Sequence, residues 1–144
     1  MASVLKVNTL TGVTTAGSIV VTGEGNSTTT NLQQGLAKAW QRSDGGAGSV
    51  ELGDSLNHGS ITDNGTGDYT CAYTNNMAST NYTQAWDQKI DSASSGETNL
   101  CGLLSSSGSV TTKTTSQYRA NSQDLGSAQE DHSQFGCIVF GDLA

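Results

Sequence analysis

Residues Ser60 to Thr74 read S-I-T-D-N-G-T-G-D-Y-T-C-A-Y-T, and this stretch predicts a β-hairpin. Its middle, D-N-G-T-G, holds residues that tolerate left-handed backbone and lies between two segments that suit pleated strands. Beyond the turn, Tyr69, Cys71 and Tyr73 alternate with small residues. We therefore expect one face of the second strand to lie on a core and the other to face solvent or a neighbouring subunit.

The turn of this hairpin carries side-chain oxygens on Asp63, Asn64 and Asp68. Such oxygens bind calcium in other proteins, but Gly65 comes too early for the D-x-[DN]-x-[DN]-G loop. Asx-type hydrogen bonds that close a hairpin use the same residues. We therefore expect hydrogen bonding at this turn and no metal.

Further strand-like segments follow one another at short intervals, separated by Gly- and Ser-rich turns. Residues 31–42 predict one turn of helix ending at Gly35 and then a strand from residue 36, because Gly disfavours a longer helix. Residues 123–131 are polar and predict a loop or a single helical turn. The remaining strands are expected at 49–56, 59–62, 68–74, 82–90, 98–104, 109–118 and 134–140.

This spacing of short strands is typical of all-β proteins, and we expect an antiparallel β-sandwich, jelly-roll-like, over residues 36–144. The most apolar run is F-G-C-I-V-F at 135–140, which predicts a central strand.

Residues 1–31 have a different character and predict an extended N-terminal arm. Strand-like segments at 3–10 and 18–22 flank a Gly-rich turn, and they are expected to pair as a two-stranded ribbon. Such a ribbon is marginal in water by itself, so the arm needs another surface to lie on. The residues expected to make that attachment are Val4, Leu5, Val7, Ile19, Val20 and Val21.

The composition predicts an ordered protein with a thin core. Only 33% of residues are apolar, whereas 19 Ser, 19 Thr, 18 Gly and 10 Asn make up nearly half the chain. Disordered chains of similar polarity are rich in Pro and charge, but this chain has no Pro and is 13% charged. Because so little apolar surface is available, we also expect oligomerisation.

The charge argues against nucleic acid as a partner. The net charge is −7 and the pI is about 4.4, and the six basic residues are scattered singly. Phosphate binding requires clustered Lys or Arg. No apolar run approaches the length of a membrane span, and the first ten residues lack the apolar core of a signal peptide, so we expect neither membrane insertion nor export by that route.

No catalytic or cofactor motif is recognisable. A G-x-S-x-G elbow is missing, and His58 and His132 are expected to be surface or loop residues. Cys71, Cys101 and Cys137 lack C-x-x-C spacing and predict reduced thiols, although a Cys71–Cys137 cross-strand disulfide stays an alternative. We therefore expect no catalytic residues, no metal and no cofactor.

One part of the chain resembles a known group of proteins. Residues 60–82, S-I-T-D-N-G-T-G-D-Y-T-C-A-Y-T-N-N-M-A-S-T-N-Y, resemble a domain in structural proteins of tailed bacteriophages, particularly marine and cyanobacterial ones. The first ten residues, A-K-A-W at 37–40 and V-F-G-D at 139–142 are similar to parts of such chains.

This resemblance implies a non-enzymatic virion protein, assembled in the host cytoplasm as a homotrimer. It would be a capsid decoration, a head fibre or a short fibre, docked through its arm onto another capsid or tail protein. The alternative is a receptor- or carbohydrate-binding tip of a tail fibre, in which Trp86 and Tyr82 stack on a host surface glycan.

Overall fold

The computed structural model describes residues 4–13, 19–23, 28–46, 50–89, 100–103, 113–123 and 128–144. The chain divides into two compact units, Met1–Leu36 and Ala37–Ala144.

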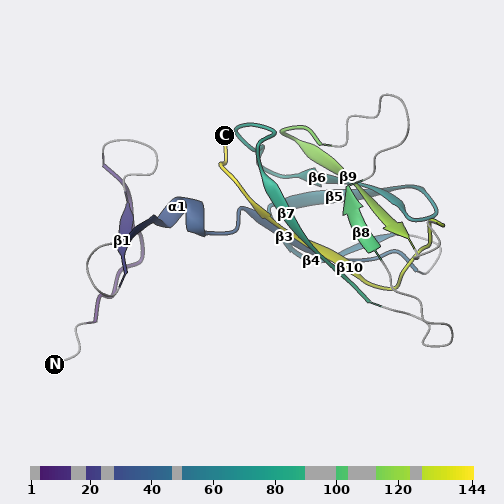
Figure 1. Cartoon of the computed structure of the whole chain (residues 1–144), viewed down its shortest axis with the longest axis horizontal. Helices are drawn as coiled ribbons and strands as arrows, with labels where there is room; N and C mark the ends of the chain where they lie inside the picture. The colour runs from purple at the N-terminus through teal and green to yellow at the C-terminus, as the bar shows by residue number, and fades with distance from the viewer. Residues whose placement is uncertain are drawn as a thin grey trace. The chain divides into compact units, whose positions relative to one another are not determined.

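The second unit consists of two four-stranded antiparallel sheets in two layers (Figure 1). One sheet has the order β4-β3-β10-β7 and the other the order β5-β6-β9-β8. The strands of the first sheet are β3 (Ala39–Asp44), β4 (Glu51–Leu56), β7 (Thr83–Gln88) and β10 (Phe135–Phe140). Those of the second are β5 (His58–Gly65), β6 (Asp68–Tyr73), β8 (Leu100–Leu103) and β9 (Gln117–Gln123).

The core lies between these sheets and is built largely from aromatic rings. Tyr69 on β6 stacks on Phe135 of β10, with ring centroids 4.6 Å apart. Trp86 on β7 meets Tyr118 of β9 edge to face, at 5.6 Å. A few large rings therefore supply the burial that a chain poor in aliphatic residues needs.

These contacts confirm the expected antiparallel β-sandwich. The hairpin is β5 and β6, and the alternation of Tyr69, Cys71 and Tyr73 places these side chains in the core. β10 lies between β3 and β7, as expected of a central strand. The helical turn is also present, because α1 (Leu32–Gly35) ends at the predicted glycine.

Two predictions about the sandwich are wrong. The strand expected at 109–118 is β9, which runs over Gln117–Gln123 and takes up the start of the segment expected to be a loop; residues 109–112 lie outside the described residues. Its inward residues include Ala120 and Ser122, which are small enough to fit a narrow core but carry no apolar signal. His58 is neither a surface nor a loop residue, since it lies in β5 and is 7% exposed. His132 lies in a loop, one of the two expected places, although it is only 3% exposed.

The first unit contains a two-stranded ribbon, but not the one expected. β1 (Val20–Thr22) pairs with β2 (Thr29–Asn31) and not with residues 3–10. The helix α1 follows directly, and the Asn31 side chain caps it by accepting a hydrogen bond from the Gln34 N–H at 3.1 Å. The backbone N–H of Leu32 donates to the Ile19 carbonyl at 2.9 Å, which ties the helix to the start of β1.

Candidate functional site

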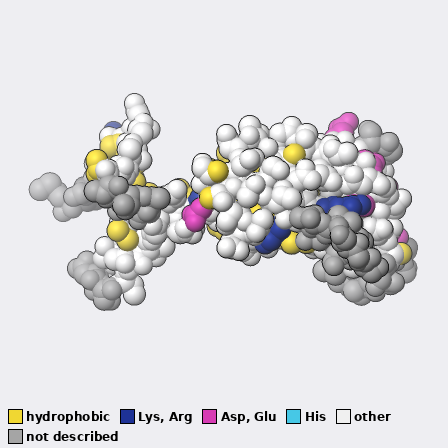
Figure 2. Space-filling model, turned by 90° about the horizontal axis from the view of Figure 1, so that it is seen from above, with side chains coloured by type: hydrophobic (Ala, Val, Ile, Leu, Met, Phe, Trp, Pro, Cys, Tyr) yellow, Lys and Arg dark blue, Asp and Glu magenta, His cyan; other side chains and the backbone are white. Residues whose placement is uncertain are grey.

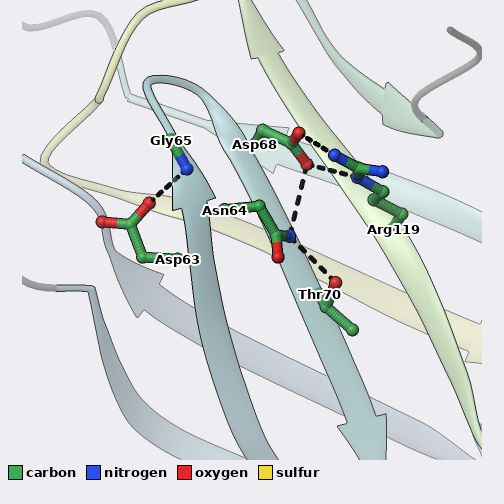
Figure 3. Close-up of polar contacts among 6 residues, drawn as sticks. All are labelled: Asp63, Asn64, Gly65, Asp68, Thr70 and Arg119. Carbon is green, nitrogen blue, oxygen red and sulfur yellow. Dashed lines mark hydrogen bonds and ion pairs between the residues drawn. The ribbon is translucent and has the colours of Figure 1, made fainter.

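The hairpin turn satisfies its own polar side chains (Figure 3). The Gly65 N–H donates to Asp63 Oδ1 at 2.8 Å, and Asn64 Nδ2 donates to Thr70 Oγ1 at 2.9 Å. Asp68 accepts from Arg119, whose Nε lies 2.6 Å from Asp68 Oδ1. Asp63, Asn64 and Asp68 are the residues that were considered both for calcium binding and for Asx-type hydrogen bonds. In the structure they make hydrogen bonds and an ion pair. Gly65 and Gly67 have φ values of +130° and +64°, which explains the glycines of this turn.

The three cysteines are free thiols, and two of them are buried. Cys137 Sγ donates to the Tyr118 hydroxyl at 3.2 Å, and Gln41 Nε2 donates to Cys71 Sγ at 3.3 Å. Burial raises the pKa of Cys71 to about 12 and that of Cys137 to about 11. Both thiols are therefore protonated near neutral pH and are poor nucleophiles.

His58 is held in an aromatic environment and is not placed as a catalytic base. Its ring lies 5.2 Å from the Tyr73 ring and 5.6 Å from the Tyr118 ring, measured between centroids. Burial lowers the pKa of His58 from 6.5 to about 4. The imidazole is therefore neutral at pH 7, with phenol rings rather than a nucleophile beside it.

The two aromatic residues expected to stack on a glycan have different environments. Tyr82 is 4% exposed, and its hydroxyl donates to the Thr114 carbonyl at 3.1 Å. Stacking by this ring would require it to leave the core. Trp86 is partly buried, and besides meeting Tyr118 it lines a shallow hollow at the surface of the sandwich.

Five of the six residues expected to attach the arm are exposed. The exposed fractions run from 50% for Val21 to 79% for Leu5, and Ile19 is half-buried. The five exposed residues are Val4, Leu5, Val7, Val20 and Val21. Large apolar side chains that are individually this exposed, and close together in sequence, are typical of a segment that is covered by another surface.

A second apolar surface lies on the sandwich, on the side of the β4-β3-β10-β7 sheet that faces away from the core. We call it the outer face. Ile138 and Phe140 on β10 point to this side and are 44% and 36% exposed. The strand register aligns Ile138 with Trp40 of β3, which in turn is opposite Leu56 of β4. The outer face therefore carries a row of apolar side chains across three strands.

The hollow lies on this outer face, next to that row. It has a volume of about 290 Å³, and its lining includes Trp40, Asp87, Gly136 and Ile138. Gly136 on β10 has no side chain, and the register places Arg42 of β3 on one side of it and Asp87 of β7 on the other. A glycine between long side chains thus leaves a depression flanked by opposite charges.

The corresponding side of the other sheet is polar. Its two central strands present Thr70, Ala72, Gln117 and Arg119, and Thr62 of β5 lies opposite Thr70. The charge of Arg119 is already paired with Asp68. The two exterior sides of the sandwich therefore differ, because among the described residues of the central strands only those of β10 expose large apolar side chains.

The residues of the outer face were missed in the sequence, although a signal for them was present. Side chains alternate along a strand, so an inward Cys137 and Val139 require Ile138 and Phe140 to point outward. Two large apolar residues at outward positions of a central strand indicate an exposed apolar surface. The run F-G-C-I-V-F predicted a central strand, without a distinction between its inward and outward residues.

Comparisons with protein-family models, with curated proteins and with solved structures find no match for this chain. The part of the chain that the structure describes contains no helix that is long and apolar enough to span a membrane. Within the same residues, no cluster of three or more His, Cys, Asp or Glu side chains is placed to hold a metal ion. Figure 2 shows a surface that consists mostly of uncharged polar side chains and backbone, with isolated charged groups.

Proposed function

We propose that the chain is a non-enzymatic structural protein on the surface of a tailed-phage virion, as a capsid decoration, a head fibre or a short fibre. The first unit attaches it to another capsid or tail protein, and the sandwich is displayed. The proposal starts from the resemblance of residues 60–82 to phage structural proteins. Its structural support comes from the difference between the two units in apolar exposure and in charge.

The observation that carries the proposal is the exposed apolar surface of the first unit. Val4, Leu5 and Val7 have no covering layer among the described residues, and they are 56% to 79% exposed. Within the described part of the chain, the β1-β2 ribbon is two strands wide and no further strand pairs with either edge, so both edges are open to strand addition. A binding partner would supply both the missing apolar contacts and the missing backbone hydrogen bonds.

The distribution of charge is consistent with this division of roles. The first unit contains one basic residue, Lys6, and one acidic residue, Glu24, so it is formally neutral. The whole net charge of −7 is carried by the second unit. A neutral segment can be buried against a partner at little electrostatic cost, while a charged sandwich stays soluble on the particle surface.

The chemistry of the core supports a role without catalysis. The buried cysteines are protonated at neutral pH because their pKa values are raised, and His58 is neutral because its pKa is lowered. No nucleophile is paired with a base at these positions. The sandwich also exposes an apolar outer face, which supports self-association; a homotrimer is the stoichiometry that the resemblance implies.

A carbohydrate-binding tip is the second candidate, and one observation favours it. The hollow at Gly136 is bordered by Trp40 and by Asp87, and sugar sites use aromatic rings beside polar groups. Glycan-array binding by the intact protein, lost in Trp40→Ala without a change in the unfolding midpoint, would support this candidate. Absence of binding to any glycan would count against it.

The arm proposal is tested with substitutions in the full-length chain. A variant that combines Val4→Asn, Leu5→Ser and Val7→Asn removes the apolar side chains but keeps the length of the segment. The matched control is Lys6→Gln with Asn8→Ser, in the same segment. We expect the apolar variant to be lost from purified particles, with the sandwich still folded, and the control to be incorporated like the unmodified chain. Equal incorporation of both variants would refute docking through these residues.

A further inference from the structure

The outer face of the β4-β3-β10-β7 sheet has an arrangement that is complementary to itself. β10 runs along its middle, with β3 on one side and β7 on the other. The register aligns Trp40, Ile138 and Ala85 in one row across these strands, and Arg42, Gly136 and Asp87 in the next outward row. In each row, the residue on β3 and the residue on β7 have complementary properties, which are size in one row and charge in the other.

The residues on β3 and β7 differ in size in the first row and in charge in the second. Trp40 is large and Ala85 is small, whereas Arg42 is positive and Asp87 is negative. A two-fold axis parallel to β10 and lying just above it would turn a second outer face onto the first and exchange the two sides. Each Trp40 would then face the Ala85 of the other copy, and each Arg42 would face its Asp87.

We propose that the outer face binds a second copy of this chain, face to face, about a two-fold axis along β10. The residues on the axis, Ile138 and Phe140, meet their own counterparts and form an apolar centre. Arg42 and Asp87 form two symmetry-related ion pairs that flank this centre. The residues near the axis thus provide burial, and the charges set the register.

The charges of this face are available for such pairing, unlike those of the other sheet. Among the described residues, Arg42 makes no ion pair. Asp87 Oδ2 lies 3.5 Å from Gln134 Nε2, at the long limit of a hydrogen bond. On the opposite side of the sandwich, Asp68 and Arg119 already neutralise each other within one chain. Charge complementarity therefore selects the outer face rather than the polar one.

The apolar exposure of the face also requires a cover. Leu56, Ile138 and Phe140 are 48%, 44% and 36% exposed, in a chain whose own core is small. Exposed apolar patches on a soluble protein usually mark an interaction surface. This dimer does not depend on a virion location, and it competes with the homotrimer that the resemblance implies.

The test uses charge exchange in the full-length protein. Native mass spectrometry at physiological ionic strength, with protein at about 0.1 mM, should give a mass twice that of the 14.8 kDa chain. Arg42→Asp places two carboxylates opposite each other at both pairs, and Asp87→Arg places two guanidinium groups there. We expect each single variant to weaken the dimer by at least about tenfold in Kd.

The decisive step is to mix the two single variants. In a heterodimer, the carboxylate introduced by Arg42→Asp on one chain faces the guanidinium introduced by Asp87→Arg on the other. The unchanged Arg42 of the second chain faces the unchanged Asp87 of the first, so both ion pairs are restored. We expect each variant alone to dimerise at least about tenfold more weakly than the unmodified chain and the mixture to give heterodimers, which no effect within one chain can produce. Circular dichroism and thermal unfolding should show that both variants fold.

Two further variants complete the design. Thr62→Asp adds a negative charge to the polar side of the other sheet, and we expect its dimer to be unchanged. Ile138→Asp places a carboxylate on the axis, and we expect it to be monomeric. A trimeric mass, a monomeric mass for the unmodified chain, or a mixture of the single variants that stays monomeric would each overturn the proposal.

Discussion

Burial of His58 predicts that the sandwich loses stability on mild acidification. The ring is 7% exposed and packs against Tyr73 and Tyr118, and burial lowers its pKa from 6.5 to about 4. The folded state therefore binds a proton less readily than the unfolded state, where the value is 6.5. The stability that this neutral imidazole provides is complete above pH 6.5 and is lost as the pH falls from 6.5 toward 4.

The size of this effect follows from the two pKa values. Between pH 7.5 and pH 5.0, linkage gives a loss of about 2 kcal/mol in the free energy of unfolding from this one group. The neighbouring phenols stay neutral throughout, because burial raises the pKa of Tyr73 and of Tyr118. Ordinary carboxyl groups have pKa values near 4, so they contribute little above pH 5.0.

The assay is urea unfolding at both pH values, for the unmodified chain and for His58→Phe. The variant keeps a ring in the site but has no titrating nitrogen. We expect the unmodified chain to lose about 2 kcal/mol more than the variant on going from pH 7.5 to pH 5.0. An equal loss in both proteins would refute the conclusion that His58 is buried and neutral in the fold. Both conditions lie above the pI of about 4.4, which limits precipitation.

Three further predictions concern the core and its turns. Phe135→Ala removes the ring on which Tyr69 stacks, so urea unfolding should show a loss of about 3 to 5 kcal/mol; a loss below about 1 kcal/mol would contradict this packing. Gly67→Ala should cost at least about 2 kcal/mol, because φ is +64° and the new Cβ would meet the backbone of β9, whereas Gly102→Ala has open space and should be nearly neutral. Cys71, with its pKa raised to about 12, should react with iodoacetamide at pH 8 at least about 100-fold more slowly in the folded protein than in urea; comparable rates would show an accessible thiolate.

The sequence predicted those parts of the fold that have strong local signals. The turn at residues 63–67 has a specific backbone requirement, and Gly65 and Gly67 meet it with positive φ values. The alternation in β6 is equally local, because its two large side chains, Tyr69 and Tyr73, lie on the same side of the strand with Cys71 between them. The sequence therefore predicted both that this segment is a strand and which of its side chains face the core.

β9 was misplaced because its signal depends on partners that are distant in sequence. After Tyr118, its inward residues Ala120 and Ser122 are small, and large rings from other strands fill the core near them. The burial of His58 in a strand was not predicted for a related reason. A histidine carries no apolar signal, yet neutral imidazole fits between aromatic rings when burial lowers its pKa.

The outer face was the part of the fold that the sequence predicted least well. The rows that contain Trp40 and Arg42 combine residues from β3, β10 and β7, which lie far apart in sequence. Only the strand order brings Arg42 and Asp87 to opposite sides of Gly136. No local pattern specifies that order, so the alignment of Ile138 with Trp40 and of Arg42 with Asp87 could not be predicted, although strand alternation does place Ile138 and Phe140 on one side of β10.

The most direct test of the virion proposal is to locate the protein on phage particles. Particles from infected cells would be purified on a density gradient and labelled with antibody raised against the full-length chain, with detection by immunogold electron microscopy. The account predicts that the chain copurifies with intact particles and that label lies on their surface. A chain that stays in the soluble lysate fraction, with unlabelled particles, would contradict it.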